Sequence, residues 1–327
     1  MKTSTKQDIL KLIAKQEPIG ITQIAEHFGI SNQIVHRHIL GLLESEKIIK
    51  NGTPPKVYYF INHGNQTENI AFSAKQKQIL EEHFLSITPN GTLQKGEKGF
   101  VDRCKQRDLD VHKLIIDYEK IIHKTDSLKK DNKLINTINI FKKQFPEVYI
   151  DGLRYCDAYQ IQQFGKSKLG NLAFYAKQSQ NKKLIQEVID LTRQQITAFI
   201  KAHKIDGICY APASIRRNPQ FMDEVRKGYQ IGLPEIKLQK IFASDIIIPQ
   251  KSIKGTSQRI KNAEQTIFIV GNQPTVKNLL MIDDFVGSGA TINICAKKVR
   301  EKKLAKKIYA ISLLGNIDFS YEVISEV

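Results

Sequence analysis

The stretch KNLLMIDDFVGSGAT, residues 277–291, decides the fold of the C-terminal part of this chain. It opens with an apolar run of strand length, which predicts a strand buried on both faces. The paired acids Asp283 and Asp284 end that run, a glycine loop follows over 287–291, and a helical pattern covers 292–302. A buried strand holds such a loop rigidly at the carboxyl edge of a sheet, where open α/β sheets bind ligands.

The residue types in this stretch suit a sugar phosphate. Two adjacent carboxylates can accept hydrogen bonds from the 2′- and 3′-hydroxyls of a ribose. Glycines let backbone N–H groups approach a phosphate, which the positive end of the following helix also attracts. The alternative is an acid-capped strand with a glycine turn before a helix. The predicted ribose and phosphate site comprises Asp283, Asp284, Gly287, Ser288, Gly289, Ala290 and Thr291.

An apolar strand followed by Asp-Asp-x-x-Gly-Ser-Gly-Ala-Thr resembles the phosphoribosyl pyrophosphate (PRPP) signature of the type I phosphoribosyltransferases. The resemblance covers about residues 148–327. It implies an α/β domain, a parallel sheet with flanking helices, that binds PRPP or a nucleoside monophosphate. In an active transferase, Mg²⁺ would bridge the pyrophosphate and the ribose hydroxyls of PRPP. The resemblance therefore implies no direct metal ligand from the protein.

Two other segments fit this resemblance. Residues 205–217 indicate a strand leading into a loop with proline and two arginines, the position of the family's pyrophosphate loop. Residues 250–263 precede a predicted strand over 266–270 and resemble the family's flexible loop. The alternatives are a solvated basic turn in the first loop and a structural salt bridge of Arg259 in the second. The implied contacts are Ala213, Ser214, Arg216 and Arg217 in the pyrophosphate loop, and Lys251, Lys254 and Arg259 in the flexible loop.

A spaced set of residues ahead of the PRPP strand resembles the ComF-like branch of that family. The set consists of Gln250, Arg259, Asn262 and Phe268. The chain departs from the branch at its N-terminus, where the sequence has no cysteine-rich zinc ribbon. It also lacks the branch's Arg-Gly-Phe-Asn-Gln run after Arg217. The sequence therefore does not assign the residues that would bind an acceptor base.

Residues 1–62 show three short helical patterns and then a hairpin. Gly29 supplies a turn between the second and third helices, and Ser31 is a natural N-cap for the third. A strand, turn and strand follow over 47–60. These residues resemble a winged helix-turn-helix, in which the third helix enters the major groove of DNA and the wing contacts the backbone or minor groove. The implied DNA contacts are Asn32, Gln33, His36, Arg37 and Lys56.

A winged helix used for dimerisation or protein contact is the alternative. Residues 1–62 carry eight basic against five acidic side chains, a net charge of only +3. Residues 63–145 are polar, Lys-rich and mostly helical in pattern, and we interpret them as a linker or middle segment. Residues 146–327 alternate apolar strands with helical segments, which predicts a parallel sheet covered by helices. The sequence thus predicts three parts, with boundaries after residues 62 and 145.

The composition is that of a globular protein with excess positive charge. Hydrophobic residues make up 41% and charged residues 25% of the chain, and the net charge of +17 attracts polyanions. Residues 240–310 carry 13 basic and five acidic side chains, so the densest charge flanks the predicted phosphate site. No apolar run approaches the roughly 18–20 residues that span a bilayer. We find no signal peptide and no CxxC pair, and expect a cytoplasmic protein with reduced thiols and no membrane partner.

Two functions fit these patterns. The first is a DNA-binding transcription regulator whose transferase-like domain responds to PRPP or a nucleotide, an order of domains that resembles bacterial purine repressors. The alternative is a catalytically active phosphoribosyltransferase that converts a base and PRPP to a nucleotide and pyrophosphate, in nucleotide salvage or nucleic-acid metabolism. The expected partners are PRPP or a nucleoside monophosphate and DNA. The family resemblance adds a second copy of the chain in a homodimer.

Overall fold

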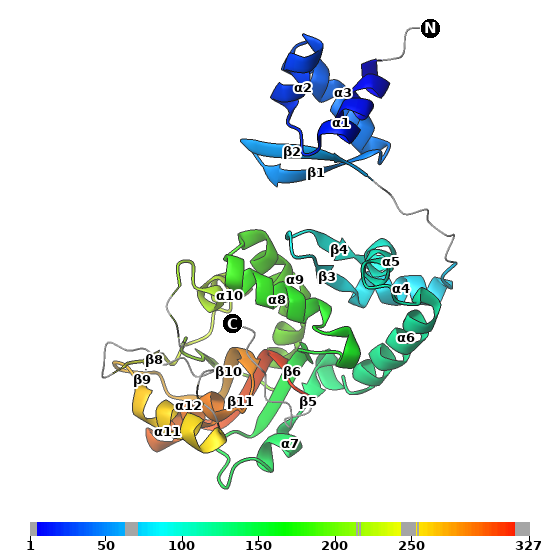
Figure 1. Ribbon diagram of the computed structural model, residues 1–327. Coiled ribbons are helices and arrows are strands. Elements are labelled where there is room, and N and C mark those ends of the chain that lie inside the picture. Colours follow the sequence, from blue (N-terminus) through cyan, green and yellow to red (C-terminus); the bar gives the residue numbers. More distant parts are fainter. Residues whose placement is uncertain are drawn as a thin grey trace. The chain divides into compact units, whose positions relative to one another are not determined.

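The chain forms two compact units, Met1–Ala71 and Phe72–Val327. The computed structural model describes residues 5–62, 71–213, 215, 217–242, 253 and 255–317 (Figure 1). Residues 72–145, which the sequence predicts as a middle segment, belong to the second unit. Within the described residues, every helix is too short or too polar to cross a membrane. All four cysteines are buried and free of disulfides.

The N-terminal unit contains the three helices and the hairpin that its sequence predicts. Gly29 ends the second helix with φ of 62°, a left-handed conformation that favours glycine. The side chain of Ser31 accepts a hydrogen bond from the backbone N–H of Ile34 at 3.4 Å and so caps the third helix. Buried aliphatic side chains from all three helices form the core. The elements are α1 (Thr5–Gln16), α2 (Ile21–Phe28), α3 (Asn32–Glu44), β1 (Ile48–Thr53) and β2 (Lys56–Ile61).

A five-stranded sheet forms the centre of the second unit. Its order is β5-β6-β11-β10-β7, with β6, β11, β10 and β7 parallel and β5 antiparallel to β6. The predicted strand that ends at Ile282 in fact runs to Val286, because Leu314 and Gly315 of the neighbouring strand continue the pairing beside it. Both aspartates therefore lie within the strand. The bounds are β5 (Ile135–Asn136), β6 (Gly152–Ala158), β7 (Gly207–Tyr210), β10 (Val276–Val286) and β11 (Ala305–Gly315).

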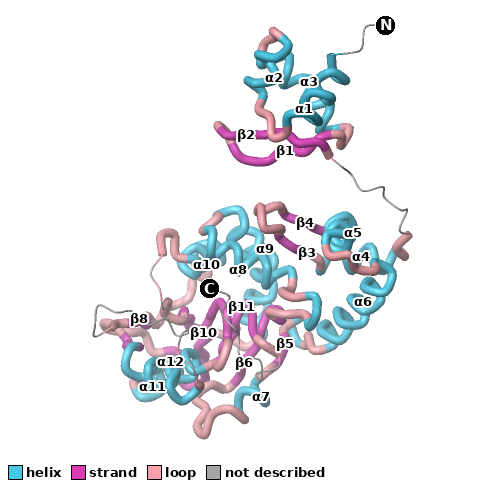
Figure 2. Tube along the Cα trace, in the orientation of Figure 1, coloured by secondary structure: helices cyan, strands magenta, loops and turns pink. Residues whose placement is uncertain are grey.

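Helices cover both faces of this sheet (Figure 2). Side chains of β10 alternate between the faces, because successive residues of a strand point to opposite sides. Leu279 and Met281 pack in the core formed with α7, α11 and α12. Leu280 and Ile282 pack in the core formed with α8, α9 and α10. The bounds are α7 (Ile138–Lys142), α8 (Lys168–Ser179), α9 (Lys182–Ala202), α10 (Phe221–Tyr229), α11 (Thr256–Thr266) and α12 (Ala290–Glu301).

One predicted strand lies outside the central sheet. The strand expected over 266–270 is present as β9 (Ile267–Ile269), and it pairs antiparallel with β8 (Leu238–Lys240). The apolar pattern of such a short strand predicts burial without identifying its partner. This two-stranded ribbon begins and ends the segment that contains the predicted flexible loop.

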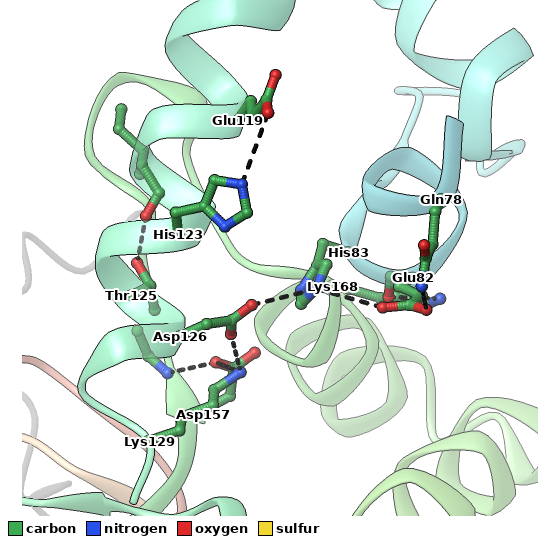
Figure 3. A network of polar contacts seen from close by, with 12 residues as sticks. Gln78, Glu82, His83, Glu119, His123, Thr125, Asp126, Lys129, Asp157 and Lys168 are labelled. Atoms are coloured by element: carbon green, nitrogen blue, oxygen red, sulfur yellow. Dashed lines mark hydrogen bonds and ion pairs between the residues drawn. The ribbon is translucent and has the colours of Figure 1, made fainter. Parts of the chain in front are cut away.

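Residues 72–133 form a layer that is attached to β6 and α8. Aromatic rings of Phe84, Phe100 and Tyr118 pack together, and Tyr118 also contacts Phe164 with ring centroids 5.0 Å apart. A polar network joins the same elements to the sheet (Figure 3). The bounds are α4 (Ala74–His83), β3 (Leu85–Ile87), β4 (Leu93–Lys95), α5 (Gly96–Gln106) and α6 (Val111–Ser127), with short 3-10 turns at Asp131–Lys133 and Gln162–Phe164.

The network in Figure 3 connects α4, α6 and β6 through charged groups. His83 Nε2 lies 3.4 Å from an oxygen of Asp126. Lys129 Nζ bridges Asp126 at 3.0 Å and Asp157 at 3.1 Å. The side chain of Lys129 is largely shielded from water. Removal of Asp126 or Asp157 would therefore leave the positive charge of Lys129 poorly compensated. The network therefore fixes the first helices of this unit to the strand beside β11.

Close packing at the end of β11 gives a test of this fold. Gly315 lies opposite Ala158 of β6, and a methyl group added to it would lie 2.2 Å from the buried ring of Tyr155. We expect Gly315→Ala to lower the free energy of unfolding by about 1–3 kcal/mol, because the core must shift to admit the methyl group. Urea denaturation measures the change.

Gly232 provides the matched control, because a methyl group there meets no atom within 4 Å. Gly232→Ala should change stability by less than about 0.5 kcal/mol. Equal stability of the two variants would show that the ring of Tyr155 has room to move.

Candidate functional site

The predicted phosphate loop lies at the carboxyl edge of the sheet, beside the loop that follows β7. The backbone N–H of Ala211 donates to the carbonyl oxygen of Ile282 at 2.9 Å, which holds the start of the β7 loop against β10. The predicted helix begins two residues early, at Ala290, so the loop is shorter than 287–291. Ala290 and Thr291 are thus part of the first helical turn.

Gly289 explains where this helix begins. It is the N-cap of α12, with φ of 77°, and a Cβ atom there would lie 2.3 Å from the ring of Phe141. Any other residue would therefore be strained and would clash. No side chain caps this helix end, and its first turn contains no acidic residue. The first backbone N–H groups of α12 are consequently available to an anion, together with the hydroxyls of Ser288 and Thr291.

The two aspartates differ in their surroundings. The backbone N–H of Asp284 donates to Asp283 Oδ1 at 2.8 Å. Burial, and secondly the charge of Asp284, raise the pKa of Asp283 to about 7, although Lys177 opposes the shift. Asp283 also borders a small hollow, lined mainly by apolar groups of β7, β10 and α12. Near neutral pH the carboxyl group of Asp283 is therefore only partly ionised.

Lys177 is a member of the site that the sequence does not reveal. It lies on α8, and its ammonium forms an ion pair with Asp284, 107 residues further along the chain. Arg217 of the β7 loop donates from Nη1 to the backbone oxygen of Lys177 at 2.5 Å. This contact joins α8, the end of β10 and the β7 loop at one place. No local pattern around Lys177 distinguishes it from other helix lysines.

The predicted pyrophosphate loop is described only in part. Arg217 is partly buried, and its backbone N–H donates to the side chain of Gln220 at 3.0 Å. Ala213 is exposed in the same loop. Ser214 and Arg216, which the sequence also assigns to this site, lie outside the described residues.

The predicted flexible loop is also described in part. Lys251 and Lys254 lie outside the described residues. Arg259 is in the first turns of α11, and its Nε donates to the backbone oxygen of Ile253 at 2.8 Å. This bond connects the helix to the end of the loop that precedes it.

Aromatic side chains border the aspartates. The rings of Tyr159 and Phe285 meet edge to face, with centroids 5.0 Å apart. Lys166 Nζ lies 4.4 Å from the ring centroid of Phe174, which is one helical turn before Lys177 on α8. The aromatic rings are only partly buried. Tyr159 and Phe174 thus share the ammonium of Lys166, and Tyr159 also packs on Phe285.

The predicted DNA contacts are exposed on the N-terminal unit. Asn32, Gln33, His36 and Arg37 of α3 are all exposed, while the same helix buries Val35, Ile39 and Leu42. Lys56 is exposed at the start of β2. The polar groups therefore lie on the face of α3 that the core of this unit does not use.

Similarity to known proteins is found among solved structures, and it is weak. No protein-family model matches the chain, and no curated protein matches it. Among solved structures, a hypoxanthine phosphoribosyltransferase from Staphylococcus aureus is similar, with 13% sequence identity and a TM-score of 0.26. The match covers 41% of this chain and 65% of that one, so this chain spans less than two thirds of the neighbour.

The raised pKa of Asp283 makes stability depend on pH. Between pH 3.8 and about pH 7, Asp283 is protonated in the folded chain and ionised in the unfolded chain. The free energy of unfolding therefore falls as pH rises through that window. Asparagine carries no charge and keeps the oxygen that accepts the Asp284 N–H. We expect Asp283→Asn to raise the free energy of unfolding at pH 8 by roughly 1–3 kcal/mol, and much less at pH 4.

Denaturant titrations at the two pH values measure this difference. Asp131→Asn, at an exposed position outside the site, is the control and should show no such difference. An equal effect of Asp283→Asn at both pH values would mean that this carboxyl group titrates normally.

Proposed function

We propose that the Phe72–Val327 unit binds PRPP or a nucleoside monophosphate at the carboxyl edge of its sheet. One observation carries the proposal. Within a few residues, β10 presents two adjacent carboxylates and then a glycine loop at an uncapped helix N-terminus. A ribose 5-phosphate has hydroxyls at one end and a dianion at the other. Along this segment the carboxylates, which accept hydrogen bonds, come first and suit the hydroxyls. The N–H groups of the helix N-terminus, which donate, come next and suit the phosphate.

Each part of the site would then have one task. Asp283 and Asp284 accept hydrogen bonds from the ribose hydroxyls, and the N-terminus of α12 holds the 5′-phosphate. Asp284 has two oxygens, so one can keep Lys177 while the other meets a hydroxyl. Arg217, with the basic residues assigned to the two loops from the sequence, neutralises a diphosphate.

Magnesium would enter this site with the diphosphate. Among the described residues, no three His, Cys, Asp or Glu side chains gather as a metal site. Two neighbouring carboxylates, of which Asp284 pairs with Lys177, fit a ligand that brings its own ion. When bound, the ion would neutralise charge on the diphosphate, and the chain would only orient the ribose and phosphate groups.

We propose further that the N-terminal unit is a winged helix that binds DNA, and that the whole chain is a PRPP- or nucleotide-responsive transcription regulator of the ComF-like branch. The exposed polar face of α3 supports DNA reading, because Asn and Gln side chains can pair with adenine edges and Arg with guanine or phosphate. Under regulation, saturating PRPP should change the affinity for duplex DNA by about 5- to 150-fold. If the chain is only a catalyst, PRPP need not change its affinity for DNA.

One observation favours catalysis as a second candidate. The raised pKa of Asp283, about 7, is suited to a group that takes up a proton at neutral pH. A transferase must remove a proton from the nitrogen of many acceptor bases. Release of pyrophosphate from PRPP, measured against a panel of bases, tests this candidate directly. If pyrophosphate is released with one base and PRPP does not change the affinity for DNA, the chain is an enzyme and not a regulator.

Calorimetry with PRPP and magnesium tests the binding site itself. Asp283→Asn with Asp284→Asn should abolish measurable PRPP binding, because both acceptors for the ribose hydroxyls lose their charge. Circular dichroism of the double variant checks that it is folded. The matched control, Asp131→Asn with Asp190→Asn, changes two exposed carboxylates outside the site and should bind as the natural chain does. Unchanged affinity of the first variant would remove the site assignment.

Replacement of Arg37 tests DNA binding. Arg37→Ala should weaken binding to duplex DNA about 5- to 10-fold, since it removes a cation from the face of α3 that is proposed to meet the DNA. Fluorescence anisotropy at a stated salt concentration measures the affinity. Lys11→Ala removes the same charge from an exposed position of α1 and should have a smaller effect. Equal affinities of the two variants would point to protein contact as the role of this unit.

A further inference from the structure

Six exposed lysines gather at the amino edge of the central sheet, away from the proposed nucleotide site. They come from the segment before β7, the start of β10 and the connection from α12 into β11. We call them the amino-edge lysines. They are Lys204, Lys277, Lys302, Lys303, Lys306 and Lys307.

Backbone contacts bring these three segments together. The side chain of Asn278 donates to the backbone oxygen of Lys204 at 3.0 Å. The backbone N–H of Val276 donates to the oxygen of Leu304 at 2.9 Å, which holds the α12–β11 connection against β10. Asn278 pairs with Lys307 across the two parallel strands. Neighbouring strands lie about 4.8 Å apart, so the positions of these lysines lie side by side along the edge of three strands.

These lysines cannot serve the nucleotide site. Helix α12 begins at the phosphate loop and has 12 residues, so it carries the chain about 18 Å toward the opposite edge of the sheet. In the sequence, the basic run that includes Lys302 and Lys307 follows shortly after the phosphate loop. In the fold it lies at the other end of the same helix. Its charge therefore needs a different explanation.

The charge of this edge is poorly compensated. Within the described residues, none of the six lysines has a carboxylate oxygen within 4.0 Å, whereas nearby Lys297 pairs with Glu264 and Arg300 pairs with Asp151. The acids closest in sequence are Asp206 and Glu301. Asp206 uses its carboxylate to accept backbone N–H groups of Lys277 and Asn278, at 2.7 to 3.0 Å.

We propose that the amino-edge lysines bind the phosphate backbone of nucleic acid, independently of base sequence. The edge spans about 10 Å across three strands, and duplex DNA carries one negative charge per about 1.7 Å of its axis, so several phosphates face the edge together. Flexible lysines without a glycine loop or pocket suit a polyanion better than one small phosphate. The described segments of this edge expose no large apolar side chain that could enter a bilayer.

This surface goes beyond the proposed nucleotide site and the proposed DNA reading by α3. It would give the second unit a nonspecific affinity of its own. Affinity of this kind depends steeply on salt, because each neutralised phosphate releases counterions.

The test compares full-length variants by anisotropy with a duplex of random sequence over a range of salt. The edge variant replaces Lys302, Lys303, Lys306 and Lys307 by glutamine. Its slope of log affinity against log salt should be smaller than that of the natural chain by about 2 to 4, and its affinity at low salt at least about tenfold weaker. The control replaces four other exposed lysines of the same unit, Lys113, Lys124, Lys182 and Lys183, by glutamine.

The control variant has the same net charge as the edge variant. Its slope of log affinity against log salt should stay within about 0.5 of that of the natural chain, as expected when no phosphate contact is lost. An unchanged slope in the edge variant, or an equal loss in both variants, would overturn the proposal. If the edge variant no longer binds phosphatidylserine vesicles but keeps the natural salt dependence of DNA binding, the edge binds a membrane. That result would also overturn the proposal. PRPP calorimetry of the edge variant should match the natural chain, which separates this result from the nucleotide site.

Discussion

Burial of β10 on both faces is the constraint on which the second unit depends. Four successive side chains of this strand, Leu279 to Ile282, are at most 2% exposed, and they alternate between two helical layers. Each contributes about 1.5–3 kcal/mol by leaving water. Pairing with β7 and β11 on either side removes the remaining freedom. The aspartates and the glycine loop therefore start from a rigid base, which a binding site for a small charged ligand requires.

Charge at the carboxyl edge is balanced through contacts between distant segments. Burial and a neighbouring carboxylate oppose ionisation of Asp283, while the ammonium of Lys177 favours it. Arg217 in turn holds the backbone of Lys177. A ligand that brings hydroxyls and a metal ion would relieve repulsion between the acids. The raised pKa of Asp283 therefore makes the stability of the folded chain fall as pH rises toward 7.

Helix α12 separates the two proposed anion sites. Its N-terminus offers backbone N–H groups in a fixed loop, which suits one dianion of defined shape. The connection after its C-terminus leads into exposed lysines, whose flexible charges suit a long polyanion. The +17 net charge of the chain thus has a spatial arrangement that the total does not reveal.

The sequence by itself determined the local features: the strand, loop and helix around 277–302, the turn at Gly29, the cap at Ser31 and the order of elements in residues 1–62. These depend on neighbours within a few residues, which periodicity and glycine positions report. Only the tertiary structure decided that Lys177 meets Asp284, that β9 pairs outside the central sheet, and that the lysines after α12 lie far from the phosphate loop. Such contacts join segments whose separation in the chain carries no local signal, because packing rather than sequence spacing selects the partner.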